Sequence, residues 1–318
     1  MKLNKRGIGI VFDWIFSIVA GVLIFSFLIY FAVQHTDLFG KVTARVVAEE
    51  LDILFSGYET MQTKSVLDFG KKIELEFSCD DGEQRFKINN KEGKTMRGKI
   101  IFAEKNIKSD KINVATASWN IPFRVANFIY IWDKRYELDY DPDLKLPEWM
   151  GSSVPGDVKV KFVQDSSLAS SSSSSFDCSQ YFFRNQNNQE YDKIVYYDKN
   201  PSDNDDVRGY VCFKDDKRKS FFFGKTMMIG TIFSENREDF ECVKSIAVKR
   251  LRIVNEVYSK KADKIIFSEF PRCEIDGYNR AVHDPEKLRN FDSFDFGYIN
   301  RIENANKDLI SRGCVGVY

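Results

Sequence analysis

The chain has 318 residues, and its 47 basic side chains are balanced by 47 acidic ones, so the formal net charge is zero. A balanced charge provides no basic field for a nucleic acid, and we expect no nucleic-acid partner. The 28 phenylalanines and 14 tyrosines supply enough apolar side chains for a packed core, which excludes a mainly disordered chain.

An apolar segment near the N-terminus is predicted to cross a membrane. Residues 14–33 carry no charge, and these 20 residues extend roughly 30 Å as a helix, the thickness of a bilayer's hydrocarbon core. Trp14 and Tyr30 stand near its ends, where interfacial aromatic residues are common. A cleaved secretory signal, the alternative, would have a shorter apolar region and a small-residue cleavage site. We therefore expect an uncleaved transmembrane helix over residues 8–33.

The residues before this segment set its predicted orientation. Lys2, Lys5 and Arg6 are basic, and the positive-inside rule places such a flank in the cytoplasm. Residues 1–7 are thus predicted to be a cytoplasmic basic leader of a single-pass protein in the cell membrane. The bulk of the chain is predicted to be extracytoplasmic, with the lipid bilayer as one partner. Asp13 lies one turn from the cytoplasmic end, where its carboxylate can reach the headgroups.

The leader also resembles a known family. Lys5, Arg6 and Gly7, followed by a long apolar helix with an acidic residue near its start, are similar to the N-terminus of type IV pilins and pseudopilins. The resemblance implies cleavage by a prepilin peptidase beside Gly7 and packing of the mature helices into a filament. It also implies that Asp13 pairs with the N-terminal amine of a neighbouring copy. The sequence departs from the pattern because this residue is Asp instead of Glu and lies one position later than usual.

A helix is predicted to continue beyond the membrane, and strands follow it. Apolar residues recur at steps of three and four between residues 37 and 67, so residues 34–70 are predicted to be an amphipathic connecting helix. From Lys72 the period changes to two, and the turn at Asp81-Gly82 predicts a hairpin. Further strands are predicted at 99–103, 125–132 and 158–163. Residues 71–165 are therefore predicted to be an antiparallel, β-rich extracytoplasmic region.

A serine-rich tract divides this region from the C-terminal part. Residues 166–176 have no apolar pattern to bury and are predicted to be a flexible loop or linker. Beyond it, strands are predicted at 193–197, 209–213, 220–223 and 227–233, an extended return at 264–267, and helices at 242–260 and 285–312, the second interrupted near Gly297. Asp284 and Pro285 are a predicted helix start, and Gly313 is a predicted stop. The fold class is therefore α+β, with C-terminal helices in residues 177–318.

The cysteines are predicted to form disulfide bonds. All six follow the predicted membrane segment, as suits an oxidising compartment: Cys79, Cys178, Cys212, Cys242, Cys273 and Cys314. A helix from 242 to 260 and an extended return from 263 to 272 would cover similar lengths of roughly 27 Å. This geometry favours a bond between Cys242 and Cys273. Buried free thiols are the alternative.

No motif in the sequence indicates catalysis. We predict no catalytic residue, cofactor-binding residue or metal ligand, and we expect no cofactor. Glu74 and Glu76 share a strand face, as a carboxylate pair would, but they alternate with apolar residues and are better explained as a solvated face. The acidic loop 198–206 lacks the glycine and the closing glutamate of an EF-hand. His35 and His283 are the two histidines, and neither stands in a metal or triad motif.

These observations together predict a membrane-anchored, extracytoplasmic structural or interaction protein, either pilin-like or a component of a surface assembly. Its expected partners are other membrane or surface proteins, including further copies of the chain. A membrane-anchored ectoenzyme, a hydrolase that uses carboxylates, is the alternative. A binding factor for a surface or secretion complex is a third hypothesis.

Overall fold

The computed structural model of the chain describes residues 5–91, 93–150, 156–165, 178–179, 182, 190–200, 203–267, 273 and 275–318. Within these ranges, side chains are not described at 5–15, 17, 32–46, 203–205 and 275. The predicted serine-rich linker at 166–176 lies outside the described residues. The chain divides into two units, Met1–Glu50 and Leu51–Tyr318.

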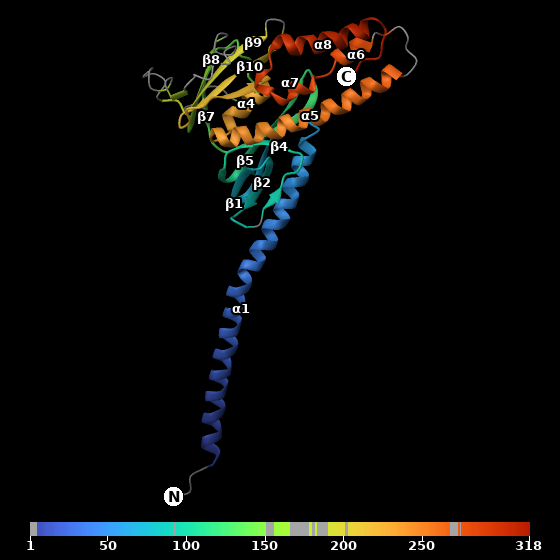
Figure 1. The fold of residues 1–318 in the computed structure, drawn as a ribbon. Helices are drawn as coiled ribbons and strands as arrows, with labels where there is room; N and C mark the ends of the chain where they lie inside the picture. The colour runs from blue at the N-terminus through green and yellow to red at the C-terminus, as the bar shows by residue number, and fades with distance from the viewer. Residues whose placement is uncertain are drawn as a thin grey trace. The chain divides into compact units, whose positions relative to one another are not determined.

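A single long helix begins the chain. Helix α1, Lys5–Tyr58, has 54 residues (Figure 1). In the first unit, its described side chains between Phe16 and Phe31 are uncharged, and their large apolar members are exposed. Among the residues whose side chains are described, no helix is both long and apolar enough to cross a membrane. The predicted connecting helix was too long at its C-terminal end, because β1 begins at Lys64.

The first sheet of the second unit, sheet A, has six strands in the order β3-β2-β1-β5-β6-β4. Its strands are β1 (Lys64–Asp80), β2 (Glu83–Ile88), β3 (Lys94–Thr95), β4 (Ile100–Ala103), β5 (Asn106–Ile121) and β6 (Phe123–Trp132). The predicted hairpin is confirmed, since Phe77 pairs with Phe86. Its two turn residues, Asp81 and Gly82, have φ of 51° and 73°, as the hairpin turn with two left-handed residues requires.

The second sheet, sheet B, has five strands in the order β11-β10-β9-β8-β7. They are β7 (Tyr136–Asp139), β8 (Val158–Gln164), β9 (Lys193–Asn200), β10 (Asp203–Phe213) and β11 (Ser220–Phe223). Strands β7, β8 and β9 are parallel to one another, and β4 is parallel to β6 in sheet A. The expectation of antiparallel pairing is therefore confirmed only in part, since both sheets are mixed. Strands β8 and β9 pair although the serine-rich tract separates them in sequence.

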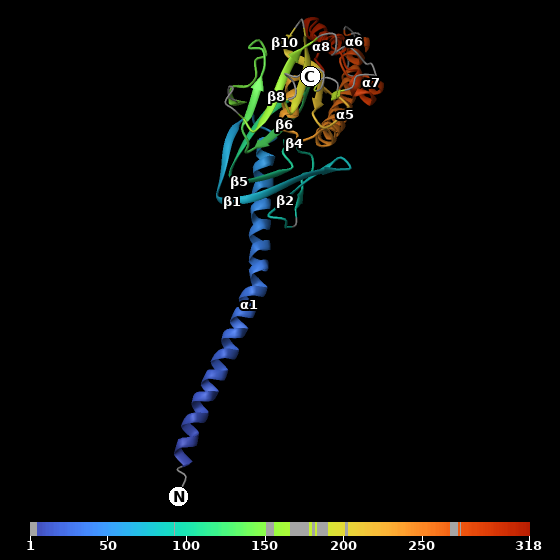
Figure 2. The ribbon, with the colours of Figure 1, turned by 90° about the vertical axis from the view of Figure 1, so that its left-hand side faces the viewer.

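Helices complete the second unit, which is α+β as predicted. They are α4 (Lys225–Phe233), α5 (Arg237–Phe267), α6 (Ile275–Arg280), α7 (Pro285–Arg289) and α8 (Phe296–Ser311), with short 3-10 turns η1 (Glu148–Met150) and η3 (Phe291–Ser293). Figure 2 shows α5 to α8 gathered on one side of strands β8 and β10. The predicted cap is confirmed, because the Asp284 carboxylate accepts a hydrogen bond from the Glu286 amide.

Two helical segments were predicted to be extended. Residues 227–233 form most of α4 and are buried on every side, so they lack the polar face that would mark a helix in sequence. Residues 264–267 continue α5 to Phe267. The predicted helix at 285–312 is divided into α7 and α8, and Asp295 caps α8 by accepting from the Tyr298 amide. Gly313, with φ of 75°, follows α8 as predicted.

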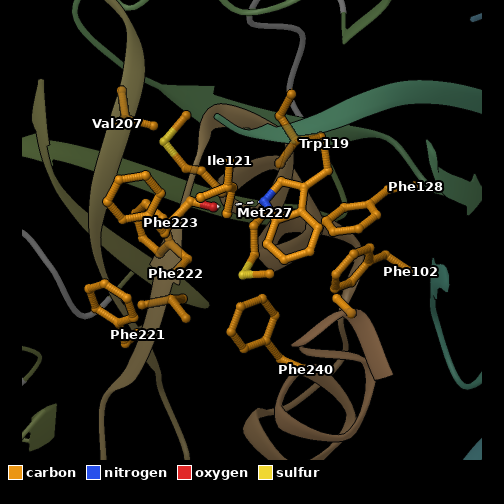
Figure 3. Packing of buried hydrophobic residues seen from close by; sticks show 14 of the residues in the cluster. Phe102, Trp119, Ile121, Phe128, Val207, Phe221, Phe222, Phe223, Met227 and Phe240 are labelled. Atoms are coloured by element: carbon orange, nitrogen blue, oxygen red, sulfur yellow. Dashed lines mark hydrogen bonds between the residues drawn. The ribbon is translucent and has the colours of Figure 1, made fainter. Parts of the chain in front are cut away.

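The core lies between the two sheets, where α4 packs against β6 and β10. Figure 3 shows its centre: the Trp119 ring lies against Phe128, with centroids 5.1 Å apart, and its Nε1 donates to the Phe223 carbonyl at 3.1 Å. Gly230 of α4 faces the Phe102 ring so closely that an added Cβ would come within 2.7 Å of it. The helix therefore depends on glycine at this position to approach sheet A.

The last turns of α1 belong to the second unit and are fixed to sheet A. Phe55 is buried and meets the Phe86 ring edge-on at 6.4 Å. The Asp52 carboxylate pairs with Lys94 at 2.7 Å and with the buried Lys99 at 2.6 Å. Burial by itself would raise the pKa of Asp52, but the hydrogen bonds and charges of the two lysines outweigh it and lower that pKa. This ion cluster and the aromatic contact join the helix to the folded unit.

Candidate functional site

The six cysteines form three disulfide bonds, which confirms the predicted disulfides. The pairs are Cys79–Cys242, Cys178–Cys212 and Cys273–Cys314. The favoured pair of Cys242 with Cys273 was wrong, because α5 continues seven residues beyond Lys260 instead of turning into an extended return. The first bond joins the end of β1 to α5 across 163 residues. By loop-closure entropy, a crosslink over so long a loop stabilises the fold by about 5 kcal/mol.

The predicted leader and anchor residues, Lys5, Arg6, Gly7 and Asp13, lie in the backbone of α1. Their side chains lie outside the described residues, and their roles stay predictions. The same holds for the side chain of His35.

His283 is a structural residue within the aromatic core. Its Nε2 lies 2.7 Å from the Ile121 carbonyl, which can only accept, so this nitrogen carries the proton. Its Nδ1 then accepts from the Tyr298 hydroxyl at 3.2 Å. Burial lowers the pKa of His283 to about 4, although the carbonyl opposes the shift. The imidazole is therefore neutral near pH 7 and serves as a bridge between β5 and α8.

The carboxylates that the sequence raised as candidates do not converge on a site. Glu76 pairs with Lys87 at 3.4 Å on a partly exposed strand face, which agrees with the interpretation of a solvated face. Asp198 pairs with Arg208 at 3.8 Å, while the side chains at 203 and 205 lie outside the described residues. In the described part of the chain, no three histidine, cysteine, aspartate or glutamate side chains are grouped as metal ligands.

A charged cavity lies where sheets A and B meet the start of α5. Its volume is about 400 Å³. Seven acidic and four basic residues line it: Glu104, Asp157, Asp192, Asp215, Asp216, Glu235, Glu238, Lys134, Lys193, Lys214 and Arg237. The lining therefore carries a net negative formal charge. None of these residues was singled out from the sequence.

Glu104 is the buried carboxylate of this cavity. It follows β4 and is only 3% exposed. Its Oε1 accepts from the Tyr136 hydroxyl at 2.6 Å, and its Oε2 pairs with Lys134 Nζ at 2.6 Å. Burial, and then the Glu104 charge, raise the pKa of Tyr136 well above 10. Desolvation opposes the charged form of Lys134, but the bond to Glu104 outweighs it and raises the pKa of that lysine. Tyr136 therefore stays protonated and Lys134 stays charged.

Lys193, the first residue of β9, is the buried amine of the cavity. It is 5% exposed, and its Nζ donates a hydrogen bond to the Ile232 carbonyl of α4. The Phe213 ring centroid lies 5.8 Å from the same nitrogen. Burial lowers the pKa of Lys193 to about 8, with the Glu104 charge acting in the opposite direction. A substantial fraction of this amine is therefore neutral at slightly alkaline pH, unlike an ordinary lysine.

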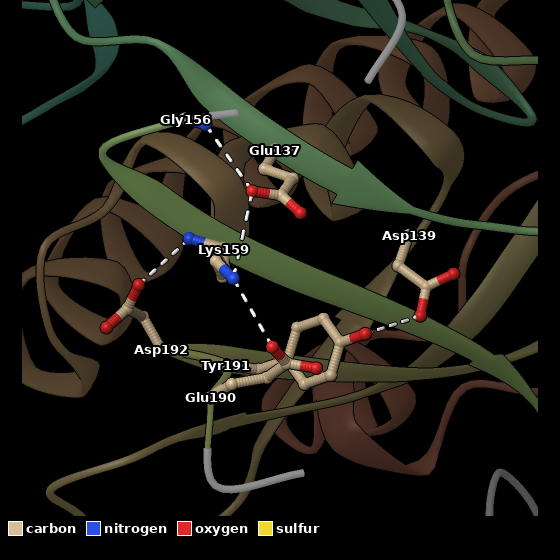
Figure 4. A network of polar contacts seen from close by, with 7 residues as sticks. All are labelled: Glu137, Asp139, Gly156, Lys159, Glu190, Tyr191 and Asp192. Atoms are coloured by element: carbon tan, nitrogen blue, oxygen red, sulfur yellow. Dashed lines mark hydrogen bonds and ion pairs between the residues drawn. The ribbon is translucent and has the colours of Figure 1, made fainter. Parts of the chain in front are cut away.

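A polar network holds the chain that leads into Lys193 (Figure 4). The Asp192 carboxylate accepts from the Lys159 backbone amide at 2.8 Å, and Lys159 Nζ pairs with Glu190 at 3.3 Å. The Tyr191 hydroxyl donates to Asp139 at 2.7 Å, and burial followed by this bond raises the pKa of Tyr191 to about 12. Three consecutive residues are thus attached to β7 and β8, which fixes where β9 begins.

The cavity can hold a small molecule beside an amine of lowered pKa, a phenol and a paired carboxylate. Sequence reasoning missed these groups because Glu104, Tyr136 and Lys193 lie in three separate strands or strand ends with no shared motif. The one local signal was a lysine directly before the apolar run at 194–197. No family model matches the chain, and no curated protein and no solved structure matches it either.

Proposed function

We propose that the protein is a membrane-anchored, extracytoplasmic structural or interaction protein. The observation that carries this proposal is the exposure of the large apolar side chains in α1. Phe16 is 67% exposed and Phe31 is 51% exposed, and the large apolar side chains described between them are exposed on every face. Apolar side chains all around a helix need an apolar environment, and residues 14–33 are long enough to reach through a bilayer.

The location outside the cytoplasm is supported by the disulfides. All six cysteines of the sequence are paired, and such bonds persist in oxidising compartments. By the positive-inside rule, the basic residues Lys2, Lys5 and Arg6 support a cytoplasmic location for the opposite end of the anchor. Residues 51–318 are then the part that meets other surface proteins.

A finer proposal concerns assembly. If the leader is cleaved beside Gly7, the exposed apolar helix can leave the bilayer and pack against the same helix of other copies, with Asp13 opposite a neighbour's N-terminal amine. The support is the motif Lys5-Arg6-Gly7 and the apolar helix that follows it. The exposed surface of α1 suits lipid and helix packing equally.

The hydrolase alternative has less support. A glycosidase-type site needs two carboxylates that face a substrate, one of them free to transfer a proton. In the cavity, both oxygens of Glu104 are engaged, by Tyr136 and Lys134.

Membrane fractionation tests the proposal. The full chain should stay in the membrane pellet after extraction with alkaline carbonate, should dissolve only in detergent, and should show no free thiol before reduction. Release of the protein by carbonate alone would contradict the proposed membrane anchor. Six reactive thiols before reduction would contradict the proposed location outside the cytoplasm.

The mass of the mature protein, made in a host with a prepilin peptidase, tests the assembly proposal separately. Loss of residues 1–7 is the expected result. An intact leader would exclude processing while leaving the anchor in place.

A further inference from the structure

The cavity at the start of α5 contains a buried amine in an arrangement that a purely structural lysine does not need. Within the described residues, Lys193 Nζ makes one hydrogen bond, to the Ile232 carbonyl, and has no carboxylate as an ion-pair partner. An ammonium group has three donors, and burying it without a paired charge is costly. The neighbouring Lys134 has the ion pair with Glu104 that Lys193 lacks.

The charge around this amine decides which ligand it fits. An anion would meet Lys193 but also a lining in which acidic residues outnumber basic ones. Glu104 is the charged group that acts most strongly on Lys193, and it favours a positive charge at Nζ. An uncharged ligand that leaves a positive charge on this nitrogen is therefore favoured over an anion. A carbonyl compound that forms a protonated imine has this property.

We propose that Lys193 is a covalent binding site for a small uncharged aldehyde or ketone that enters the cavity and forms an imine with its Nζ. The cavity, of about 400 Å³, has room for such a molecule. The Phe213 ring beside the nitrogen and the Tyr136 hydroxyl near Glu104 supply one apolar and one polar wall. All residues that line the cavity lie between Glu104 and Glu238. The inference is therefore independent of the proposed membrane anchor.

The step is a condensation that balances without an oxidant or reductant. The lone pair of the neutral Nζ attacks the carbonyl carbon, a carbon–nitrogen bond forms, and the carbonyl electron pair moves to oxygen. The oxygen leaves as water with two protons from the amine, and a carbon–nitrogen double bond remains. When the imine is protonated, the Glu104 charge favours the positive nitrogen, as it favours the charged form of Lys193. The lowered pKa of Lys193 supplies the neutral amine at pH 8.

Reductive labelling of the full chain in detergent tests the proposal. Propanal with cyanoborohydride at pH 8 converts each imine into a stable propylamine, which peptide mass spectrometry locates. Lys134 is an internal control, since it lines the same cavity but its pKa is raised. We expect Lys193 to be labelled about tenfold faster than Lys134, because far more of its amine is neutral at this pH.

The controls separate the cavity from the local sequence. In reduced, urea-unfolded protein the preference for Lys193 should disappear. Lys193→Met should abolish the fast phase of propanal uptake, whereas Lys260→Met, at an exposed lysine outside the cavity lining, should leave that phase unchanged. Equal or slower labelling of Lys193 in the folded protein would overturn the proposal. A preference for Lys193 that persists after unfolding would also overturn the proposal, because the folded cavity would then not cause the preference. Both of these measurements use only the wild-type chain.

Discussion

Apolar side chains have opposite environments in the two units of the chain. Phe27 in α1 is 64% exposed, whereas Phe102 in sheet A is fully buried. The difference follows from pattern. In β1 and β2 the apolar residues alternate with polar ones, so one face of the sheet can be covered by the rest of the unit. Between Phe16 and Phe31, α1 has no polar face to turn toward water. We propose that its apolar partner is a bilayer or other copies of the chain.

The strongest test of this comparison places charges in the exposed apolar helix. Leu23 and Ile24 lie at the middle of residues 14–33, and each arginine at the centre of a spanning helix costs about 3 kcal/mol of insertion free energy. The double variant Leu23→Arg/Ile24→Arg should therefore move the protein from the carbonate-resistant pellet to the supernatant.

The matched control is Ile253→Arg, because Ile253 is also an exposed apolar residue but lies on α5 in the second unit. It should leave fractionation unchanged. If the double variant remained in the pellet like the control, the exposed apolar side chains of α1 would not be what holds the protein in the membrane. The proposed difference between the two units would then be wrong.

The second test removes an apolar side chain from the interior. Trp119 is fully buried against Phe128, and its Nε1 donates to the Phe223 carbonyl. Trp119→Ala should lower the free energy of unfolding by about 3–5 kcal/mol, since the cavity left behind adds to the lost burial. Urea unfolding of the detergent-solubilised chain, followed by circular dichroism, measures the change.

Phe27→Ala is the control for this measurement, since it truncates an aromatic side chain of the first unit that is 64% exposed. It should leave the urea midpoint where it is. A loss below about 1 kcal/mol for Trp119→Ala would show that this part of the interior is loosely packed.

The two regions also differ in how far sequence could predict them. The hairpin of β1 and β2 was predictable because both of its signals are local: the alternation of Ile73, Leu75 and Phe77, and the turn Asp81-Gly82. Helix α4 was not, because residues buried on all sides show a continuous apolar run that a strand shows as well. Cys242 and Cys79 lie 163 residues apart, and only the packing of α5 against β1 brings them together.

The cavity was beyond sequence reasoning for a related reason. Lys193 looks like an ordinary charged residue at a strand start, and its burial depends on α4, whose Ile232 carbonyl it contacts. Glu104 becomes a buried carboxylate only when Tyr136 and Lys134 reach it from beyond β6. Strands β7, β8 and β9, which carry part of the cavity lining, are parallel neighbours. Because parallel strands are joined by long connections, no local sequence pattern shows that their residues lie together.

The smallest expected effect concerns a polar group within the apolar interior. The pKa of His283 is lowered to about 4 in the folded protein, from an ordinary value of 6.5. Above about pH 7.5 the imidazole is almost entirely neutral in both states and contributes little pH dependence. As the pH falls from 6.5 to 4, the unfolded chain binds a proton that the folded chain does not. The free energy of unfolding should therefore decrease by about 3 kcal/mol over this window.

His283→Gln isolates this contribution, because its amide nitrogen can still donate to the Ile121 carbonyl but does not titrate. The quantity to compare is the difference between the free energies of unfolding of the wild type and the variant at each pH. This difference removes the contribution of carboxyl groups, which also titrate between pH 6.5 and 4. Burial raises the pKa of Asp133 and of Asp239, which acts in the opposite direction and is common to both proteins. The wild-type profile should fall more steeply than the variant's between pH 6.5 and 4, and the two should run parallel above about pH 7.5. Parallel profiles throughout would mean that the imidazole takes up its proton equally well in the folded and the unfolded chain. That result would overturn the neutral, buried imidazole whose Nδ1 accepts from the Tyr298 hydroxyl.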